Sequence, residues 1–163
     1  MRFNRTERLT LTLLLVVGAF VAIAPAPAMA QTGGPYTYYA VTPCRVADTR
    51  DGTGGVPIAP LVAGTPVTFT VQGKCLIPAG AKAATLNVTI TAPSLPGYLT
   101  LWPAGTTQPT VSTINFAAGE PALANGAIVP LGATTPDLSI LFGSYTTGGR
   151  IDVILDVTGY FAP

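Results

Sequence analysis

The chain has 163 residues, and charged side chains make up only 9% of them. If residues 1–30 are removed as a leader, the remaining 133 fit one compact domain. These 133 residues carry five basic and six acidic side chains, so no excess of positive charge favours a nucleic-acid partner. Histidine is absent from the chain, which excludes the triads and zinc sites that depend on imidazole.

The first 30 residues have the pattern of a secretory signal peptide. Three arginines precede a largely apolar run of 16 residues, 9–24, and Ala28 and Ala30 place small side chains at the cleavage positions. A transmembrane anchor is the alternative, but the run is shorter than the roughly 20 residues that span a bilayer. The sequence therefore predicts cleavage after Ala30, no later transmembrane segment, and a secreted or cell-surface location.

Cys44 and Cys75 are the only cysteines in the chain. Because an exported protein meets oxidising conditions, a disulfide is the simplest pairing. Closing a loop of about 30 residues would stabilise the fold by about 3–4 kcal/mol. A redox role is the alternative, since Arg45 and Lys74 lie beside the two cysteines and would favour a thiolate.

Eight short strands are predicted after a mobile segment, residues 31–35. The pattern is clearest in residues 84–91, where Leu86, Val88 and Ile90 share one face and polar residues the other. Glycine and proline clusters separate such segments, and none of them has the apolar spacing of a long helix. The predicted strands are 36–42, 65–72, 84–91, 97–102, 112–116, 127–131, 138–142 and 150–158.

Eight strands in so short a chain favour an all-β fold with two packed antiparallel sheets, and a closed barrel is the alternative. We expect a single β-sandwich domain over residues 36–163 with a jelly-roll-like or other Greek-key strand order. An immunoglobulin-like order is disfavoured because Trp102 follows both cysteines. The loop 51–61 lacks alternation and should cross one end of the sandwich.

Several segments, taken in order, resemble a family of β-rich modules of exported bacterial proteins. The segments are Pro-Cys-Arg-Val-Ala-Asp-Thr-Arg at 43–50, Leu-Asn-Val-Thr at 86–89, residues 97–103, residues 112–116, Asn125 and residues 152–161. Such modules occur in actinobacteria and other soil bacteria, alone, in tandem or beside cell-wall hydrolase domains. The family has no settled biochemical activity, so the resemblance implies a non-catalytic exported module and leaves the ligand open.

Four of the eleven charged residues after position 30 lie between positions 45 and 51. One interpretation is a binding site, in which the guanidinium groups of Arg45 and Arg50 hold a carboxylate or a sugar hydroxyl. The other, which we favour, is a structural network that pairs these arginines with Asp48, Asp152 and Asp156.

Asp48 and Asp51 stand beside a glycine-rich turn that offers carbonyl oxygens for calcium, but the spacing does not match an EF-hand loop. An aspartate at such a turn more often bonds the turn's own backbone. A hydrolase would need two carboxylates across a cleft, and nothing marks such a pair. We therefore predict no metal site, no cofactor and no catalytic residue; the acidic residues considered are Asp48, Asp51, Glu120, Asp137, Asp152 and Asp156.

Tyr98 and Trp102 are the best candidates for ligand binding, because they share the more polar face of one predicted strand and aromatic rings stack on sugars. The competing interpretation is that Trp102 plugs one end of the core. Other aromatic residues cluster near the chain ends and in a late loop, where they either close the sandwich or form an interaction patch. They are Tyr36, Tyr38, Tyr39, Tyr145, Tyr160 and Phe161.

The sequence thus predicts a secreted, non-catalytic module that binds cell-wall or environmental glycan at the cell surface. An assembly protein that self-associates through sheet edges, such as its tyrosine-rich opening strand, is one alternative. A small hydrolase that uses cross-strand carboxylates is another.

Overall fold

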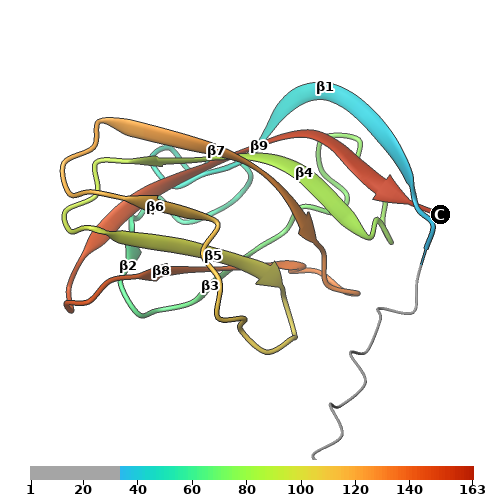
Figure 1. The fold of residues 1–163 in the computed structure, drawn as a ribbon. Helices are drawn as coiled ribbons and strands as arrows, with labels where there is room; N and C mark the ends of the chain where they lie inside the picture. Colours follow the sequence, from blue (N-terminus) through green and yellow to red (C-terminus); the bar gives the residue numbers. More distant parts are fainter. Residues whose placement is uncertain (1–33) are drawn as a thin grey trace, which may run out of the picture. The chain divides into compact units, whose positions relative to one another are not determined.

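The structure, a computed structural model, describes residues 34–163. The predicted leader and residues 31–33 of the predicted mobile segment lie outside the described residues. The described part consists of nine β-strands in two antiparallel sheets, with no helix (Figure 1). The strands are β1 (Thr37–Asp48), β2 (Leu61–Val62), β3 (Val67–Phe69), β4 (Ala83–Thr91), β5 (Gly97–Pro103), β6 (Ile114–Phe116), β7 (Ala122–Pro130), β8 (Leu138–Gly143) and β9 (Arg150–Ala162).

The two sheets have the strand orders β1-β9-β4-β7 and β3-β8-β5-β6, and β2 also pairs with β9. If β2 is left aside, the chain is one long antiparallel hairpin in which β1 pairs with β9, β3 with β8, β4 with β7 and β5 with β6. This hairpin rolls into two facing layers, which is the jelly-roll arrangement. The predicted antiparallel β-sandwich with jelly-roll-like order is therefore confirmed.

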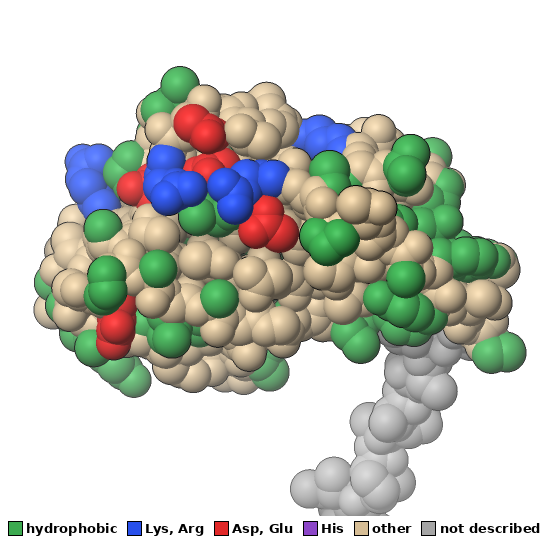
Figure 2. Space-filling view, turned by 90° about the horizontal axis from the view of Figure 1, so that it is seen from above, with side chains coloured by type: hydrophobic (Ala, Val, Ile, Leu, Met, Phe, Trp, Pro, Cys, Tyr) green, Lys and Arg blue, Asp and Glu red, His purple; other side chains and the backbone are tan. Residues whose placement is uncertain are grey.

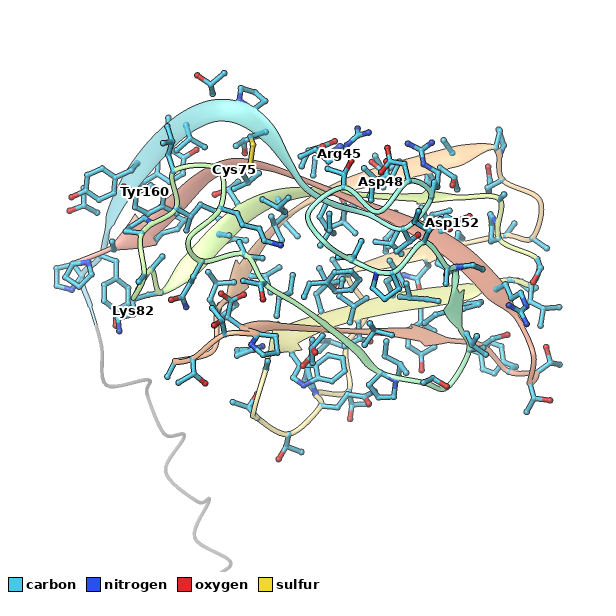
Figure 3. The ribbon with its side chains drawn as sticks, turned by 180° about the vertical axis from the view of Figure 1, so that it is seen from behind. Arg45, Asp48, Cys75, Lys82, Asp152 and Tyr160 are labelled. Carbon is cyan, nitrogen blue, oxygen red and sulfur yellow. A yellow bond between two sulfur atoms is a disulfide. The ribbon has the colours of Figure 1, made fainter. Side chains whose placement is uncertain are left out.

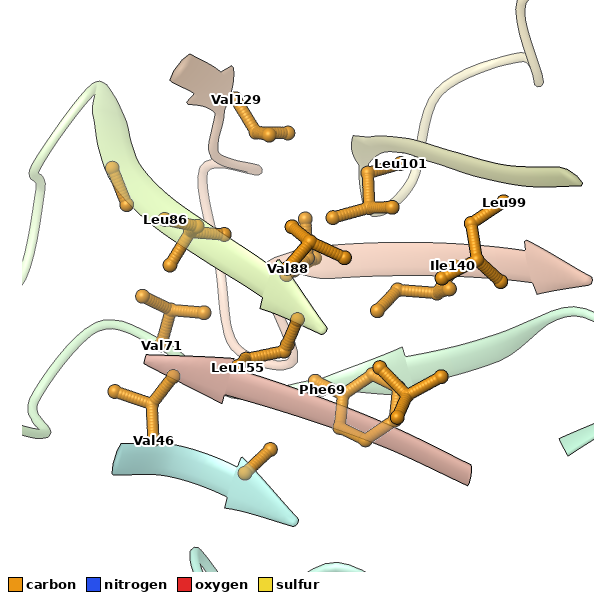
Figure 4. Close-up of a cluster of buried hydrophobic side chains, with 14 of the residues drawn as sticks. Val46, Phe69, Val71, Leu86, Val88, Leu99, Leu101, Val129, Ile140 and Leu155 are labelled. Carbon is orange, nitrogen blue, oxygen red and sulfur yellow. The ribbon is translucent and has the colours of Figure 1, made fainter. Parts of the chain in front are cut away.

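The core lies between the two layers (Figure 4). Strand β4 shows why the sequence folds this way, because its residues alternate strictly between buried apolar and half-buried side chains. Leu86, Val88 and Ile90 are at most 1% exposed and meet Leu99 and Ile140 of the facing sheet in one cluster. Burying each such side chain contributes about 1.5–3 kcal/mol to the hydrophobic term.

Several strand boundaries differ from the prediction, most of all the end of β1, both ends of β3, the start of β7 and the end of β9. Strand β1 continues through Pro43 to Asp48, because it is an edge strand with a register shift between Ala40 and Cys44, where a proline is tolerated. Strand β3 ends at Phe69, because the backbone amides of Val71 and Gln72 donate to the Asp137 side chain and not to a neighbouring strand. The short strand β2 was not predicted, so the described strands number nine and not eight.

The disulfide between Cys44 and Cys75 is confirmed. It joins β1 to the turn that follows residue 72, and the two Cα atoms are 5.8 Å apart. Cys75 and Leu76 both have positive φ angles, 51° and 64°, which non-glycine residues rarely adopt. The cross-link thus connects the edge of one sheet to a tightly bent turn.

Within the described part of the chain, no helix is long and apolar enough to cross a membrane.

Candidate functional site

The outer face of the four-stranded sheet is partly covered by the loop between β5 and β6. Leu99 and Leu101 of β5 point into the core, so Tyr98, Thr100 and Trp102 lie on the outer face. The loop, residues 104–113, folds back over this face.

Hydrogen bonds to β5 hold that loop in place. The Thr100 hydroxyl donates to the carbonyl of Val111 at 2.6 Å, and the Trp102 indole Nε1 donates to the carbonyl of Thr106 at 3.2 Å. The backbone amide of Leu101 donates to the Thr113 hydroxyl at 3.3 Å. The loop is therefore fixed on a rigid strand at both of its ends.

Trp102 lies beneath this loop and is only 6% exposed. Its indole N–H is already bonded to Thr106, and neither face of the ring is open to a ligand. Trp102 therefore fills the space between β5 and the loop, and it is not available as a stacking surface beside Tyr98.

Tyr98 is half-buried and borders a hollow of about 320 Å³. It pairs across the sheet with Gly143 on one side and Asn115 on the other. A Cβ atom at Gly143 would collide with the Tyr98 ring, so this glycine lets the ring lie flat against the sheet. The other residues that line the hollow are Thr100, Gln108, Pro109, Thr110, Val111, Ser112 and Asn115.

The lining of the hollow is uncharged and mixed, with polar side chains beside the apolar Pro109 and Val111. Gln108 and Asn115 supply amide groups, Thr110 and Ser112 supply hydroxyl groups, and Tyr98 supplies an aromatic ring. The Asn115 amide donates to the Ser112 hydroxyl at 3.0 Å, which orients both groups at the rim. Such a set can hydrogen-bond a neutral ligand that carries many hydroxyl groups while one ring packs against its apolar face.

The charged cluster lies elsewhere, over β1 and β9 (Figures 2 and 3). Arg45 binds Asp156 of β9 through two hydrogen bonds, of 2.8 and 3.3 Å, and Asp48 through a third of 3.1 Å. Arg50 binds both carboxylate oxygens of Asp48, at 2.9 and 2.8 Å. One arginine thus links the end of β1 to β9, and both converge on Asp48.

Asp48 is fully buried and accepts four hydrogen bonds, the fourth from the backbone amide of Arg50 at 3.0 Å. The pKa of the Asp48 carboxyl is lowered from 3.8 to about 2. The largest cause is the hydrogen bond from the Arg50 side chain, which outweighs the opposing effect of burial. Because Asp48 and Asp156 occupy the guanidinium groups of Arg45 and Arg50, the predicted ligand-binding arginines are engaged within the protein.

Asp152 differs from the prediction of a structural ion pair. Its carboxylate accepts a hydrogen bond from the Thr49 hydroxyl at 2.8 Å, and no salt bridge of the described residues includes it. The Thr49 hydroxyl also accepts the backbone amide of Val153 at 3.0 Å. Thr49, next to Asp48 in the chain, is thus the residue that meets Asp152.

Asp51, considered for calcium, accepts a hydrogen bond from the backbone amide of Thr53 at 2.8 Å and so stabilises its own turn.

Asp137 is a buried carboxylate whose role could not be predicted from the sequence. It is fully buried and accepts the backbone amides of Val71 and Gln72 at 2.8 and 2.7 Å. These bonds draw the chain after β3 out of the ladder, which explains the early end of that strand.

The aromatic residues near the chain ends form two cross-strand pairs. Tyr38 packs on Phe161 with ring centroids 5.2 Å apart, and Tyr39 stacks on Tyr160 at 5.1 Å. Figure 3 shows Tyr160 beside Lys82 at the end of the molecule away from the charged cluster. These pairs close the β1–β9 ribbon, whereas Tyr145, in the turn after β8, is 95% exposed.

The loop residues Gln108, Thr110 and Ser112 and the strand residue Asn115 were not predicted as site residues. The only signal for Gln108 and Thr110 was a polar connection of about ten residues between two predicted strands, and such loops often carry function. Ser112 and Asn115 lay inside the predicted strand 112–116, where alternation alone did not mark them as site residues.

No protein-family model matches the chain, and a search of curated proteins found no match.

Proposed function

We propose that the protein is a non-catalytic module exported from a bacterial cell that binds neutral glycan in the hollow beside Tyr98. The observation that carries this proposal is the uncharged lining of the hollow, with one aromatic ring among amide and hydroxyl groups. Its volume of about 320 Å³ lies at the small end of ligand pockets. A short stretch of a cell-wall or environmental polysaccharide fits this description.

The acidic side chains support the absence of catalysis. Of the six in residues 34–163, five accept hydrogen bonds from the protein itself. A pair that acts as acid and nucleophile in glycoside hydrolysis has to face the substrate. The hollow beside Tyr98 has no carboxylate in its lining.

Export is supported by the leader pattern of residues 1–30 and by the disulfide, since disulfides persist in oxidising compartments. The resemblance to exported bacterial modules points the same way.

The test is retention of the purified protein in gels that contain neutral polysaccharides. We expect Tyr98→Ala to abolish retention, because the ring supplies the stacking surface. Tyr145→Ala removes a tyrosine from an exposed turn outside the hollow and should leave retention unchanged.

Because Tyr98 also packs on Gly143, a second variant separates binding from folding. Gln108→Ala changes an exposed loop side chain and should weaken retention several-fold with an unaltered circular dichroism spectrum. Equal retention of wild type, Tyr98→Ala and Gln108→Ala would contradict the proposed site, as would failure of the wild type to bind any neutral glycan.

A further inference from the structure

Strand β7 is a long open edge of the larger sheet. It pairs with β4 over all nine residues without a register shift and is not hydrogen-bonded to a second strand among the described residues. The opposite edge, β1, is interrupted by two register shifts and carries Pro43 and the disulfide. The edges of the other sheet, β3 and β6, have three residues each. Natural proteins usually blunt a long regular edge; β7 carries such a feature only at its last position, Pro130, so the stretch 122–128 is a regular edge.

The backbone groups that β7 directs outward can be identified from its ladder. The amide of Leu131 donates to the carbonyl of Lys82, in register with the β4–β7 pairs. In an antiparallel ladder the bonded positions alternate, so odd-numbered residues of β7 face β4. The even-numbered residues Ala122, Ala124, Gly126 and Ile128 therefore direct both their N–H and C=O groups away from the sheet.

This outward set is complementary to itself. If a second copy lies antiparallel about a two-fold axis at Asn125, Ala124 faces Gly126 and Ala122 faces Ile128 of the other copy. Each outward N–H then meets a C=O, so the partial charges match along residues 122–128. No charged side chain lies on β7 to oppose its own copy, and all four residues have an N–H to donate.

The side chains of β7 fit the same partner. Leu123 is 37% exposed and Ile128 is 63% exposed, and both would be covered by the second copy. The Asn125 amide donates to the carbonyl of Thr113 at 2.7 Å, which ties β7 to the segment before β6 and keeps the edge in place.

We propose that β7 is a homodimer interface, in which two copies join their larger sheets edge to edge through residues 122–128. This pairing uses neither the hollow beside Tyr98 nor the charged cluster, and it stands independently of glycan binding. The occupant is a second copy of this chain, since β7 carries no charged side chain that would repel its own copy, and its exposed Leu123 and Ile128 lie in the paired stretch.

The molar mass of the purified protein, measured by light scattering after size-exclusion chromatography, tests the interface. We expect the wild type to have twice the mass of one chain and Ala124→Lys to have the mass of one chain, because the two lysines would be diagonal neighbours on the same face next to the axis. Ala59→Lys makes the same change in the loop before β2, at the opposite edge, and should remain a dimer.

A second measurement does not depend on a variant. In a monomer the amides of Ala124, Gly126 and Ile128 have no acceptor among residues 34–163, so they exchange with solvent quickly. In the dimer their hydrogen exchange slows as protein concentration rises, whereas amides of β4 stay slow throughout. A wild type that is monomeric at every concentration, or fast exchange of these three amides at every concentration, would overturn the proposal.

Discussion

Asp48 shows how one residue organises the charged surface. Its side chain is buried beneath two half-exposed arginines, with 41% and 45% of their side chains exposed, and every bond it makes is charge-assisted or to backbone. The two arginines are the more conspicuous ligand candidates in the sequence, but the buried Asp48 carboxylate fixes their positions. A structural function of this cluster therefore follows from Asp48.

The lowered pKa of Asp48 predicts an acid-sensitive stability. Because the folded-state pKa is about 2 and the unfolded value is 3.8, the carboxylate stabilises the fold above about pH 4, and this contribution is lost as the pH falls toward 2. Replacing Asp48→Asn should lower the free energy of unfolding at pH 7 by about 1.5–3 kcal/mol. Denaturant titrations at several pH values should show a shallower decline between pH 4 and pH 2 for this variant.

The matched control is Asp51→Asn, because asparagine can also accept the Thr53 amide in the same turn. It should leave the free energy of unfolding at pH 7 nearly unchanged. An equal loss in both variants, or an Asp48→Asn curve as steep in acid as that of the wild type, would contradict the role given to Asp48.

Trp102 is predicted to act through stability. Trp102→Ala would empty the space under the β5–β6 loop and should lower the free energy of unfolding by about 3–5 kcal/mol. Tyr145→Ala, at an exposed position, should stay within about 0.5 kcal/mol of the wild type. Urea titration measures the free energy of unfolding of both variants. A Trp102→Ala protein as stable as the wild type would contradict the structural role given to Trp102.

The sequence could predict only part of the site at this scale. Alternation places Tyr98 and Trp102 on one face, but it contains no information about a loop that covers one of them and leaves the other beside a hollow. The predicted pairing of the arginines with Asp48 and Asp156 is confirmed, but which arginine meets Asp156 depends on register between distant strands. Asp137 gave no signal because its partners are backbone amides about 65 residues away.

Among the elements, β4 was predicted almost completely and β7 only in part. The alternation in β4 predicted residues 84–91, and the strand differs by one residue at its start. Strand β7 was predicted only from residue 127, because Ala122–Gly126 is rich in alanine and glycine, which have low β-propensity. Its first half is a strand because it pairs with β4 at every position.

The disulfide carries a prediction at the scale of the elements it joins. The double variant Cys44→Ser, Cys75→Ser should be less stable by about 3–4 kcal/mol, because a loop of 31 residues is no longer closed in the unfolded chain. Thermal unfolding under non-reducing conditions measures this loss. Wild-type protein with a reductant should melt like the double variant, and an unchanged melting temperature in both would show that the cross-link contributes nothing.

For the whole molecule, the jelly roll separates three surfaces. The hollow lies on the outer face of the β3-β8-β5-β6 sheet, the charged cluster lies over β1 and β9, and the open edge is β7. Most of the charge is thus used within the fold, and the hollow that we propose as the glycan site is uncharged.

The most direct measurement is a chemical-shift titration of the isotope-labelled protein with neutral oligosaccharides. The account predicts saturable shifts at Tyr98, at residues 108–112 and at Asn115, with none at Arg45 or Arg50. Shifts centred on the two arginines, or no shifts with any neutral oligosaccharide, would contradict it.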